Sequence, residues 1–212
     1  MDVWAAEQSA DFLRYIAGVS PRRHALYVLA LTTGMRRSEL AGLAWHNVDF
    51  DRQSVRIEQT RLHVAGDILI EEPKTVASRR TITLHDQAIG ALRKARRIQA
   101  NDQTLLGHDW IDSGFVFCKP TGEPLHPDYI TKRFGKDCIA AGARYIGFHG
   151  LRHTFATTAL LQRVNPRLVA EILGHSDIQT TLGIYSQFVP GAHADVMGAV
   201  EAALFESQDP RE

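Results

Sequence analysis

The sequence predicts a mixed α+β fold that is mainly helical and has one small three-stranded antiparallel sheet. Apolar residues recur at helical spacing through most of the 212 residues, with turn-forming residues at short intervals between the apolar runs. Strict alternation of apolar and polar residues is confined to three segments of the first half, which read SVRIEQTRLHV, DILIEE and RRTITLH. We expect these three segments to pair as one sheet, with turns at AGD and around Lys74.

The first helices are expected at residues 5–17, 22–33 and 38–43. Pro21 suits the first turn of the second helix, where its missing N–H leaves nothing unpaired, and Gly34 suits the C-terminal end of that helix. Arg36 is therefore expected just past a helix end.

The second half is expected to be helical apart from a short extended stretch with a turn at residues 115–125. Asp86 is suited to cap a helix that runs to about residue 99. Gly174 ends another helix, so that His175 falls in the turn beyond it. The remaining helices are expected at residues 127–140, 151–162 and 166–173, on or near Tyr185, and at residues 189–205.

The length fits one domain with a substantial core, and we expect a single domain over residues 1–212. No run of about 18 apolar residues occurs, and the start MDVWAAEQSADF lacks the basic and apolar regions of a signal peptide. These features predict a cytoplasmic protein without a membrane partner. Cys118 and Cys138 are too few and too far apart for a zinc site or a disulfide framework, so we expect reduced structural thiols.

Arginines in two polar segments, TGMRRSEL and FHGLRHTFAT, indicate phosphate chemistry. A phosphodiester under nucleophilic attack passes through a transition state with two negative equatorial oxygens. Many nucleases stabilise it with two metal ions held by clustered carboxylates, whereas the carboxylates here are scattered. A guanidinium stays charged and contacts two phosphate oxygens at once. Arg36 and Arg152 are therefore the candidates for this task.

A tyrosine nucleophile needs help, because its hydroxyl has an unperturbed pKa of about 10. His149 is the candidate base, and its spacing of three from Arg152 places both on one helix face if the helix begins near Gly150. The leaving 5′ oxygen needs a proton, which a flexible amine at Lys74 can supply as general acid.

These residues lie in four ordered segments that resemble the signature boxes of the tyrosine recombinases, the phage integrase family. The segments are TGMRRSEL, PKT followed by SRRTITL, HGLRHTFAT, and LGHSDIQTTLGIY, and the resemblance extends from about Ala6 to Phe205. It implies a tyrosine recombinase catalytic domain. It also implies a role for each matching residue: Arg36 as the first catalytic arginine, Lys74 as the hairpin lysine, His149 and Arg152 as the H-x-x-R pair, His175 as the second histidine, Tyr185 as the nucleophile, and Glu39 as a structural support of the arginine region.

The resemblance implies a site-specific recombinase that cleaves and rejoins DNA through a 3′-phosphotyrosyl bond. The covalent bond conserves the energy of the broken phosphodiester, so no cofactor and no metal are expected. The implied partners are double-stranded attachment or recombination sites, a homotetramer on two synapsed sites, and accessory directionality or DNA-bending proteins. TTLGIYSQ resembles phage and transposon integrases, which favours integration or excision of phage or mobile-element DNA.

Two departures from the family pattern are visible. Ten positions separate His175 from Tyr185, where nine is commoner. The N-terminal DNA-binding domain usual in the family has no counterpart in this chain, so the chain is either an excised fragment or a minimal recombinase. A tail helix at about 190–206 is expected to dock either on its own domain or on a neighbouring subunit.

The overall charge argues against strong DNA binding by this chain alone, because Lys and Arg total 24 and Asp and Glu total 24. Residues 1–150 hold 20 basic and 17 acidic residues, and residues 151–212 hold 4 and 7. Basic clusters in the first part are candidates for phosphate contacts: Arg22 and Arg23, Arg79 and Arg80, Arg93 to Arg97, and Lys132 to Lys136.

Other interpretations stand beside this one. A type IB topoisomerase-like enzyme uses similar chemistry, and a DNA-binding or assembly module that no longer cuts would keep the same fold. His149 and His153 have a spacing that suits zinc, but no third ligand and no HEXXH motif is evident. Arg37 is the rival of Arg36, and Tyr15, Tyr27, Tyr129 and Tyr145 are rivals of Tyr185 whose sequence contexts favour core packing.

Overall fold

The computed structural model describes residues 2–72, 78–175, 177–188, 197 and 201. The α-helices in this part are α1 (Ala6–Val19), α2 (Pro21–Thr33), α3 (Arg37–Gly42), α4 (Asp86–Leu106), α5 (Pro127–Ala140), α6 (Phe148–Leu161), α7 (Pro166–Leu173) and α8 (Gln179–Phe188). The strands are β1 (Val48–Asp49), β2 (Ser54–Ile57), β3 (Thr60–Val64), β4 (Asp67–Glu71) and β5 (Arg80–Thr83). The predicted mixed, mainly helical fold with a small antiparallel sheet is confirmed.

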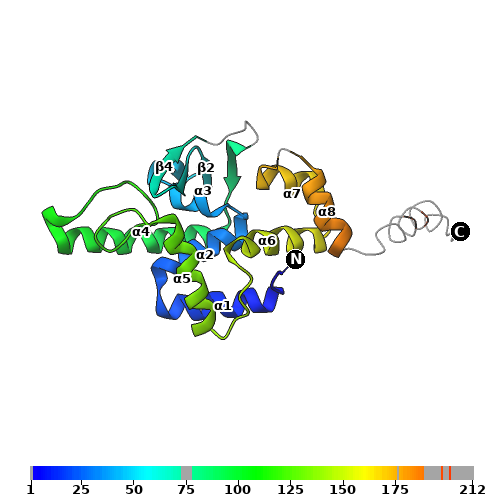
Figure 1. The fold of residues 1–212 in the computed structure, drawn as a ribbon, viewed down its shortest axis with the longest axis horizontal. Helices are drawn as coiled ribbons and strands as arrows, with labels where there is room; N and C mark the ends of the chain where they lie inside the picture. Colours follow the sequence, from blue (N-terminus) through cyan, green and yellow to red (C-terminus); the bar gives the residue numbers. More distant parts are fainter. Residues whose placement is uncertain (1, 73–77, 176, 189–196, 198–200, 202–212) are drawn as a thin grey trace, which may run out of the picture.

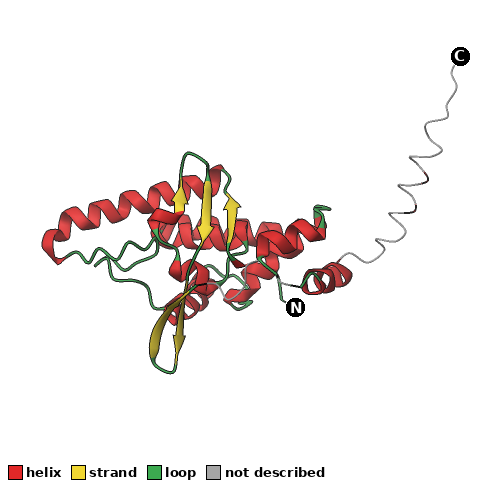
Figure 2. Ribbon diagram, turned by 90° about the horizontal axis from the view of Figure 1, so that it is seen from above, coloured by secondary structure: helices red, strands yellow, loops and turns green. Residues whose placement is uncertain are grey.

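The composition of the sheet differs from the prediction. The three-stranded sheet has the order β1-β2-β5, while β3 and β4 form a separate two-stranded hairpin (Figure 2). The expected long strand SVRIEQTRLHV is broken at Glu58 and Gln59. Gln59 leaves the sheet because its Nε2 donates to the Gly42 carbonyl at 2.8 Å. The following strand is held elsewhere, since Arg61 Nη1 donates to the Leu125 carbonyl at 2.8 Å.

Local capping sets the boundaries of several helices. α5 and α7 have the predicted bounds, and α7 begins where the Asn165 side chain accepts a hydrogen bond from Arg167 N and ends at Gly174 in the left-handed region. α4 runs seven residues beyond the predicted end, and His85 rather than Asp86 is its N-cap. α6 begins at Phe148 instead of residue 151. The predicted tail helix falls almost wholly outside the described residues.

The helices form a layered body with the sheet on one side. In Figure 1 the strands lie above α2 and α4, while α1 and α5 lie below. The main core joins these layers, and its aromatic centre contains Phe12, Tyr27, Phe134 and Phe148. Cys118 and Cys138 are buried free thiols, as predicted.

A second, smaller apolar cluster holds α7 and α8 against α6. It contains Ala156, Leu160, Val169, Leu173 and Ile184. The first half of α6 belongs instead to the main core, through Phe148 and Leu151. The side chains that α6 presents between these two clusters therefore lie at the junction of two packed units.

Within the described residues, none of the helices combines the length and the apolar character needed to cross a bilayer.

Candidate active site

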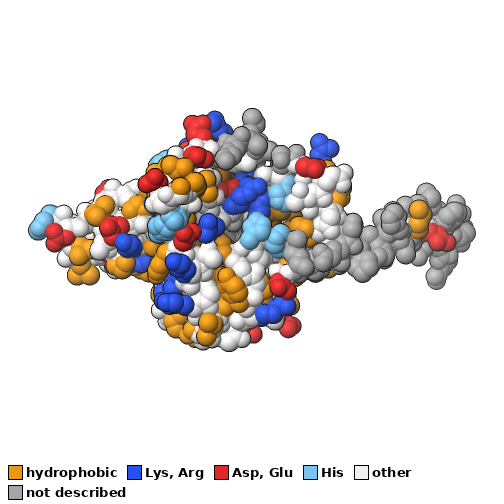
Figure 3. Space-filling view, viewed as in Figure 1, with side chains coloured by type: hydrophobic (Ala, Val, Ile, Leu, Met, Phe, Trp, Pro, Cys, Tyr) orange, Lys and Arg blue, Asp and Glu red, His pale blue; other side chains and the backbone are white. Residues whose placement is uncertain are grey.

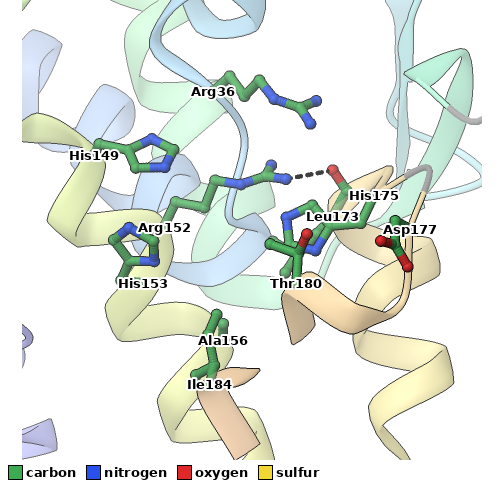
Figure 4. A pocket seen from close by; sticks show the side chains of 10 residues that line it. All are labelled: Arg36, His149, Arg152, His153, Ala156, Leu173, His175, Asp177, Thr180 and Ile184. Carbon is green, nitrogen blue, oxygen red and sulfur yellow. Dashed lines mark hydrogen bonds between the residues drawn. The ribbon is translucent and has the colours of Figure 1, made fainter. Parts of the chain in front are cut away.

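A pocket of about 310 Å³ opens where α6, α7, α8 and the start of α3 meet (Figure 4). Figure 3 shows basic and histidine side chains gathered at the centre of the face seen there. The residues lining the pocket are Arg36, His149, Arg152, His153, Ala156, Leu173, His175, Asp177, Thr180 and Ile184. The structure thus brings together four of the six predicted catalytic residues.

Arg36 reaches the pocket because α2 ends immediately before it. Gly34 terminates α2 in the left-handed region at φ 63° and ψ 19°, and Arg36 is then the N-cap of α3. Its Nη1 donates to Glu39 at 2.9 Å and its Nη2 to the Gly174 carbonyl at 3.2 Å. The side chain remains 35% exposed, so its unused N–H groups are open to a ligand.

Arg152 forms the floor of the pocket and is only 4% exposed. Its Nη1 donates to the Gly34 carbonyl at 2.8 Å. Its Nη2 donates to the Leu173 carbonyl, also at 2.8 Å, and Figure 4 shows this second bond. Burial, followed by the positive charge of Arg36, lowers the pKa of Arg152 to about 9. The group therefore remains a cation at neutral pH.

Three histidines complete the polar wall. The rings of His149 and His153 meet edge to face with centroids 4.6 Å apart. His175 Nδ1 lies 2.8 Å from the hydroxyl of the fully buried Thr181 on α8, which fixes the orientation of the ring. Desolvation in the pocket, followed by neighbouring positive charges, lowers the pKa of His149 and of His175 to about 4. Both rings are thus neutral at pH 7, and each is able to accept a proton.

Glu39 lies beneath the arginines and is 2% exposed. It accepts hydrogen bonds from the backbone and the side chain of Arg36 and from both terminal nitrogens of Arg80. Burial raises the pKa of Glu39, but the hydrogen bonds and charge of Arg80 and Arg36 outweigh it, so the pKa is lowered overall. The carboxylate is therefore ionised between two guanidinium groups.

Sequence reasoning missed the role of Arg80. We expected Arg79 and Arg80 to form a phosphate-binding cluster, but the Arg80 side chain is only 7% exposed and is bonded to Glu39. The alternation in RRTITLH was the available signal, because it places Arg80 and Ile82 on the same side of β5. Arg79 is 57% exposed and pairs with Glu72.

Lys74 lies outside the described residues. Tyr185 lies in α8, as predicted, next to Ile184, which lines the pocket. The side chain of Tyr185 is outside the part of the molecule that the structure describes. The placement of α8 is nevertheless fixed by Thr181 and Ile184, which are 0% and 4% exposed.

The rival residues are placed elsewhere. Arg37 turns away from Arg36 and donates to Asp128 at 3.1 Å and Thr131 at 3.0 Å. Of the rival tyrosines only Tyr27 is buried, so the packing expectation was wrong for the other three, which are partly exposed: Tyr15 38%, Tyr129 46% and Tyr145 53%. None of the four lines the pocket.

In the described part of the chain, one trio of side chains has the proximity that a metal site needs. Ligand atoms of His63, His126 and Asp128 lie within 4.8 Å of one another, and none of the three residues lines the pocket. Ordinary contacts account for them: His63 Nδ1 is 2.7 Å from Asp128, and His126 Nδ1 accepts from the Asp128 backbone at the start of α5. Arg37 also pairs with Asp128, and this positive charge disfavours a bound cation.

Comparison with known proteins places the chain in a family. The model of the "Phage integrase family" matches residues 5–189. A tyrosine recombinase XerC-like protein of Caldanaerobacter subterraneus is 32% identical over 184 residues, which cover 80% of this chain and 46% of that protein. The chain thus spans about half the length of this curated relative.

Solved structures agree with this placement. The Tn1549 transposon integrase in complex with transposon right end DNA matches with a TM-score of 0.79 and 27% identity, over 95% of this chain and 66% of that chain. The XerA recombinase shares the fold, with a TM-score of 0.72 at 19% identity, over 100% of this chain and 66% of that one. With a matching family model over most of its length, this chain belongs to the phage integrase family of tyrosine recombinases.

Proposed function

We propose that this chain is the catalytic domain of a site-specific DNA recombinase that acts on phage or mobile-element DNA. The observation that carries the proposal is the convergence of Arg36, Arg152, His149 and His175 on one pocket bordered by the helix that contains Tyr185. Two guanidinium groups and neutral imidazoles at one wall suit a phosphodiester that gains negative charge during the reaction.

The first step is attack by the Tyr185 hydroxyl on the scissile phosphorus. A P–O bond forms to the tyrosine, the bond to the 5′ oxygen breaks, and a 3′-phosphotyrosyl linkage and a free 5′ hydroxyl result. His149 takes the phenolic proton, and Lys74 gives a proton to the leaving oxygen. The negative phosphodiester raises the pKa of His149 above its low value in the free chain, which improves this base when DNA is bound.

The arginines and His175 hold the phosphoryl oxygens during this step. Arg36 offers its exposed N–H groups, Arg152 closes the site from below, and His175 uses the ring nitrogen that Thr181 leaves unoccupied. A 5′ hydroxyl from a partner duplex reverses the reaction and reseals the strand. The cycle conserves phosphodiester energy and requires no cofactor.

The proposed partners are those that the resemblance to the family implies. We propose double-stranded attachment or recombination sites as substrate, a homotetramer as the active assembly, and directionality or DNA-bending proteins as accessories. Support comes from the Tn1549 integrase, whose solved structures contain transposon right end DNA or circular intermediate DNA. A transposase from transposon Tn916 of Enterococcus faecalis is 29% identical over 170 residues, covering 75% of this chain and 40% of that protein.

A direct test is adduct formation on nicked duplexes that carry candidate attachment sequences, in EDTA, followed by denaturing electrophoresis. We expect a covalent protein–DNA adduct that forms without metal and is lost in Tyr185→Phe. Tyr27→Phe is the matched control, because Tyr27 is buried against Asp137 away from the pocket. No adduct from the protein on its proper site would overturn catalysis and leave a DNA-binding module. Relaxation of supercoils by a monomer would instead favour the topoisomerase-like alternative.

A further inference from the structure

Three successive carbonyl groups at the C-terminal end of α7 each accept a hydrogen bond from a different arginine. The Ile172 carbonyl accepts from Arg80 Nε at 2.5 Å, the Leu173 carbonyl from Arg152 Nη2 at 2.8 Å, and the Gly174 carbonyl from Arg36 Nη2 at 3.2 Å. The last carbonyls of a helix lack intrahelical partners and carry the negative end of the helix dipole. The end of α7 is therefore the common anchor of three guanidinium groups.

Arg80 differs from the other two because it does not line the pocket. Its Nη1 and Nη2 each donate to one oxygen of Glu39 at 3.0 Å, and its Nη1 also reaches the Ser78 carbonyl at 3.3 Å. With the bond to Ile172, every nitrogen of its guanidinium has a protein partner. Four of its five N–H groups are thus engaged by the protein, so Arg80 has little hydrogen-bonding capacity left for a bound phosphate.

The charges in this cluster explain what Arg80 contributes. Glu39 is buried and touches two cations, Arg36 and Arg80. If Arg80 were absent, the buried carboxylate would have Arg36 as its remaining charged partner, and an unpaired buried charge is costly. Arg36 would then be held by Glu39 and would have less charge available for a phosphate oxygen.

Building on the proposed function, we propose that Arg80 is a positioning residue for the phosphate-binding arginines. It neutralises Glu39 and binds the end of α7, and it thereby fixes Arg36 at the edge of the pocket with its charge free for the phosphate. Because Arg80 is the first residue of β5, it also connects the strand that follows the Lys74 segment to the arginine cluster.

Arg80→Met tests this role. We expect the single-turnover cleavage rate at saturating DNA to fall about tenfold to a hundredfold, less than for a direct oxyanion donor. The loss of rate should become smaller as the pH is lowered, because without Arg80 the pKa of Glu39 rises and protonation removes the unpaired carboxylate charge. In a Glu39→Gln background the carboxylate charge is gone, so Arg80→Met should have a much smaller effect. Arg80→Lys keeps the positive charge without the forked geometry, so its cleavage rate should lie between those of Arg80→Met and wild type. Arg80→Lys also replaces Arg80→Met as the test variant if Arg80→Met does not fold.

A readout that does not depend on cleavage separates this proposal from the proposed function. Binding of inorganic phosphate to the full chain is followed through the imidazole NMR signals of His149 and His175. We expect Arg80→Met to weaken this binding about tenfold. If wild type forms no adduct but the phosphate result holds, the function fails and the positioning role stands.

The proposal is overturned if folded Arg80→Met cleaves and binds phosphate as wild type does. It is equally overturned if Arg80→Met loses no more cleavage rate than Tyr27→Phe when the two variants have lost the same free energy of unfolding. The latter variant removes a buried hydrogen bond of 2.8 Å to Asp137, outside the pocket.

Discussion

Replacing Gly34 with alanine tests how tightly the end of α2 packs against the site. A Cβ built at Gly34 would lie 2.5 Å from Leu173 Cδ2 and 2.7 Å from Phe155 Cδ1, and the residue has φ +63°. A left-handed conformation costs a non-glycine residue roughly 1–2 kcal/mol, and overpacking a core typically costs about 1–3 kcal/mol. We therefore expect Gly34→Ala to lower the free energy of unfolding by about 2–5 kcal/mol.

The same change should slow cleavage. The Gly34 and Leu173 carbonyls are the two acceptors of Arg152, so a shift of either backbone displaces the guanidinium. Urea denaturation measures stability, and single-turnover adduct formation at a temperature where both proteins are folded measures the rate.

Gly90→Ala is the matched control. Gly90 lies inside α4, where an added Cβ would meet nothing within 4 Å. Alanine should therefore stabilise this helix by about 0.5–1 kcal/mol. A surface substitution away from any close contact typically changes the free energy of unfolding by no more than about 0.5 kcal/mol. If the free energy of unfolding of Gly34→Ala lies within this margin of the wild-type value, the close approach of α2 to α7 is wrong.

Three more predictions concern the pocket and α7. Arg36→Ala and Arg152→Ala should each reduce the single-turnover cleavage rate by about 100- to 1,000-fold; a folded variant of either with a rate within threefold of wild type would contradict its role as phosphate ligand. His149 and His175 have a pKa of about 4 in the folded chain, against an ordinary value of 6.5. Between these two pH values the unfolded chain therefore binds more protons than the folded chain. The free energy of unfolding should consequently fall as the pH is lowered from 6.5 towards 4. NMR titration of the imidazole signals checks this, and pKa values near 6.5 for His149 and His175 in the folded chain without DNA would refute it. Asn165→Ala removes the side-chain cap of α7 and should cost about 1 kcal/mol in urea denaturation, whereas no change would mean that the apolar cluster alone sets the start of the helix.

Local sequence chemistry was sufficient for much of the helical framework. α7 has the predicted bounds because Asn165, Pro166 and Gly174 act on the neighbouring backbone, whatever the rest of the chain does. The same reasoning placed Arg36 after the end of α2 and His175 in the turn beyond α7. The spacing of His149 and Arg152 likewise indicated that one helix would present both residues to one pocket.

The sheet could not be derived in this way. Strand pairing joins residues far apart in the sequence, and the break at Glu58 and Gln59 depends on the Gly42 carbonyl, which only the folded chain brings near. Alternation alone indicates that a segment is extended but does not identify its partner. The predicted single sheet therefore became a three-stranded sheet and a separate hairpin.

The sequence by itself determined the residue types of the site and the helices that carry them, because capping, periodicity and motif spacing are local properties. The tertiary structure alone decided how their charges are used. Arg79 and Arg80 are adjacent in the sequence, yet one faces solvent and the other is buried against Glu39 and the end of α7. Burial and the pairing of charges depend on contacts between distant segments, so only the fold distinguishes an arginine that is open to a ligand from one that holds its neighbours in place.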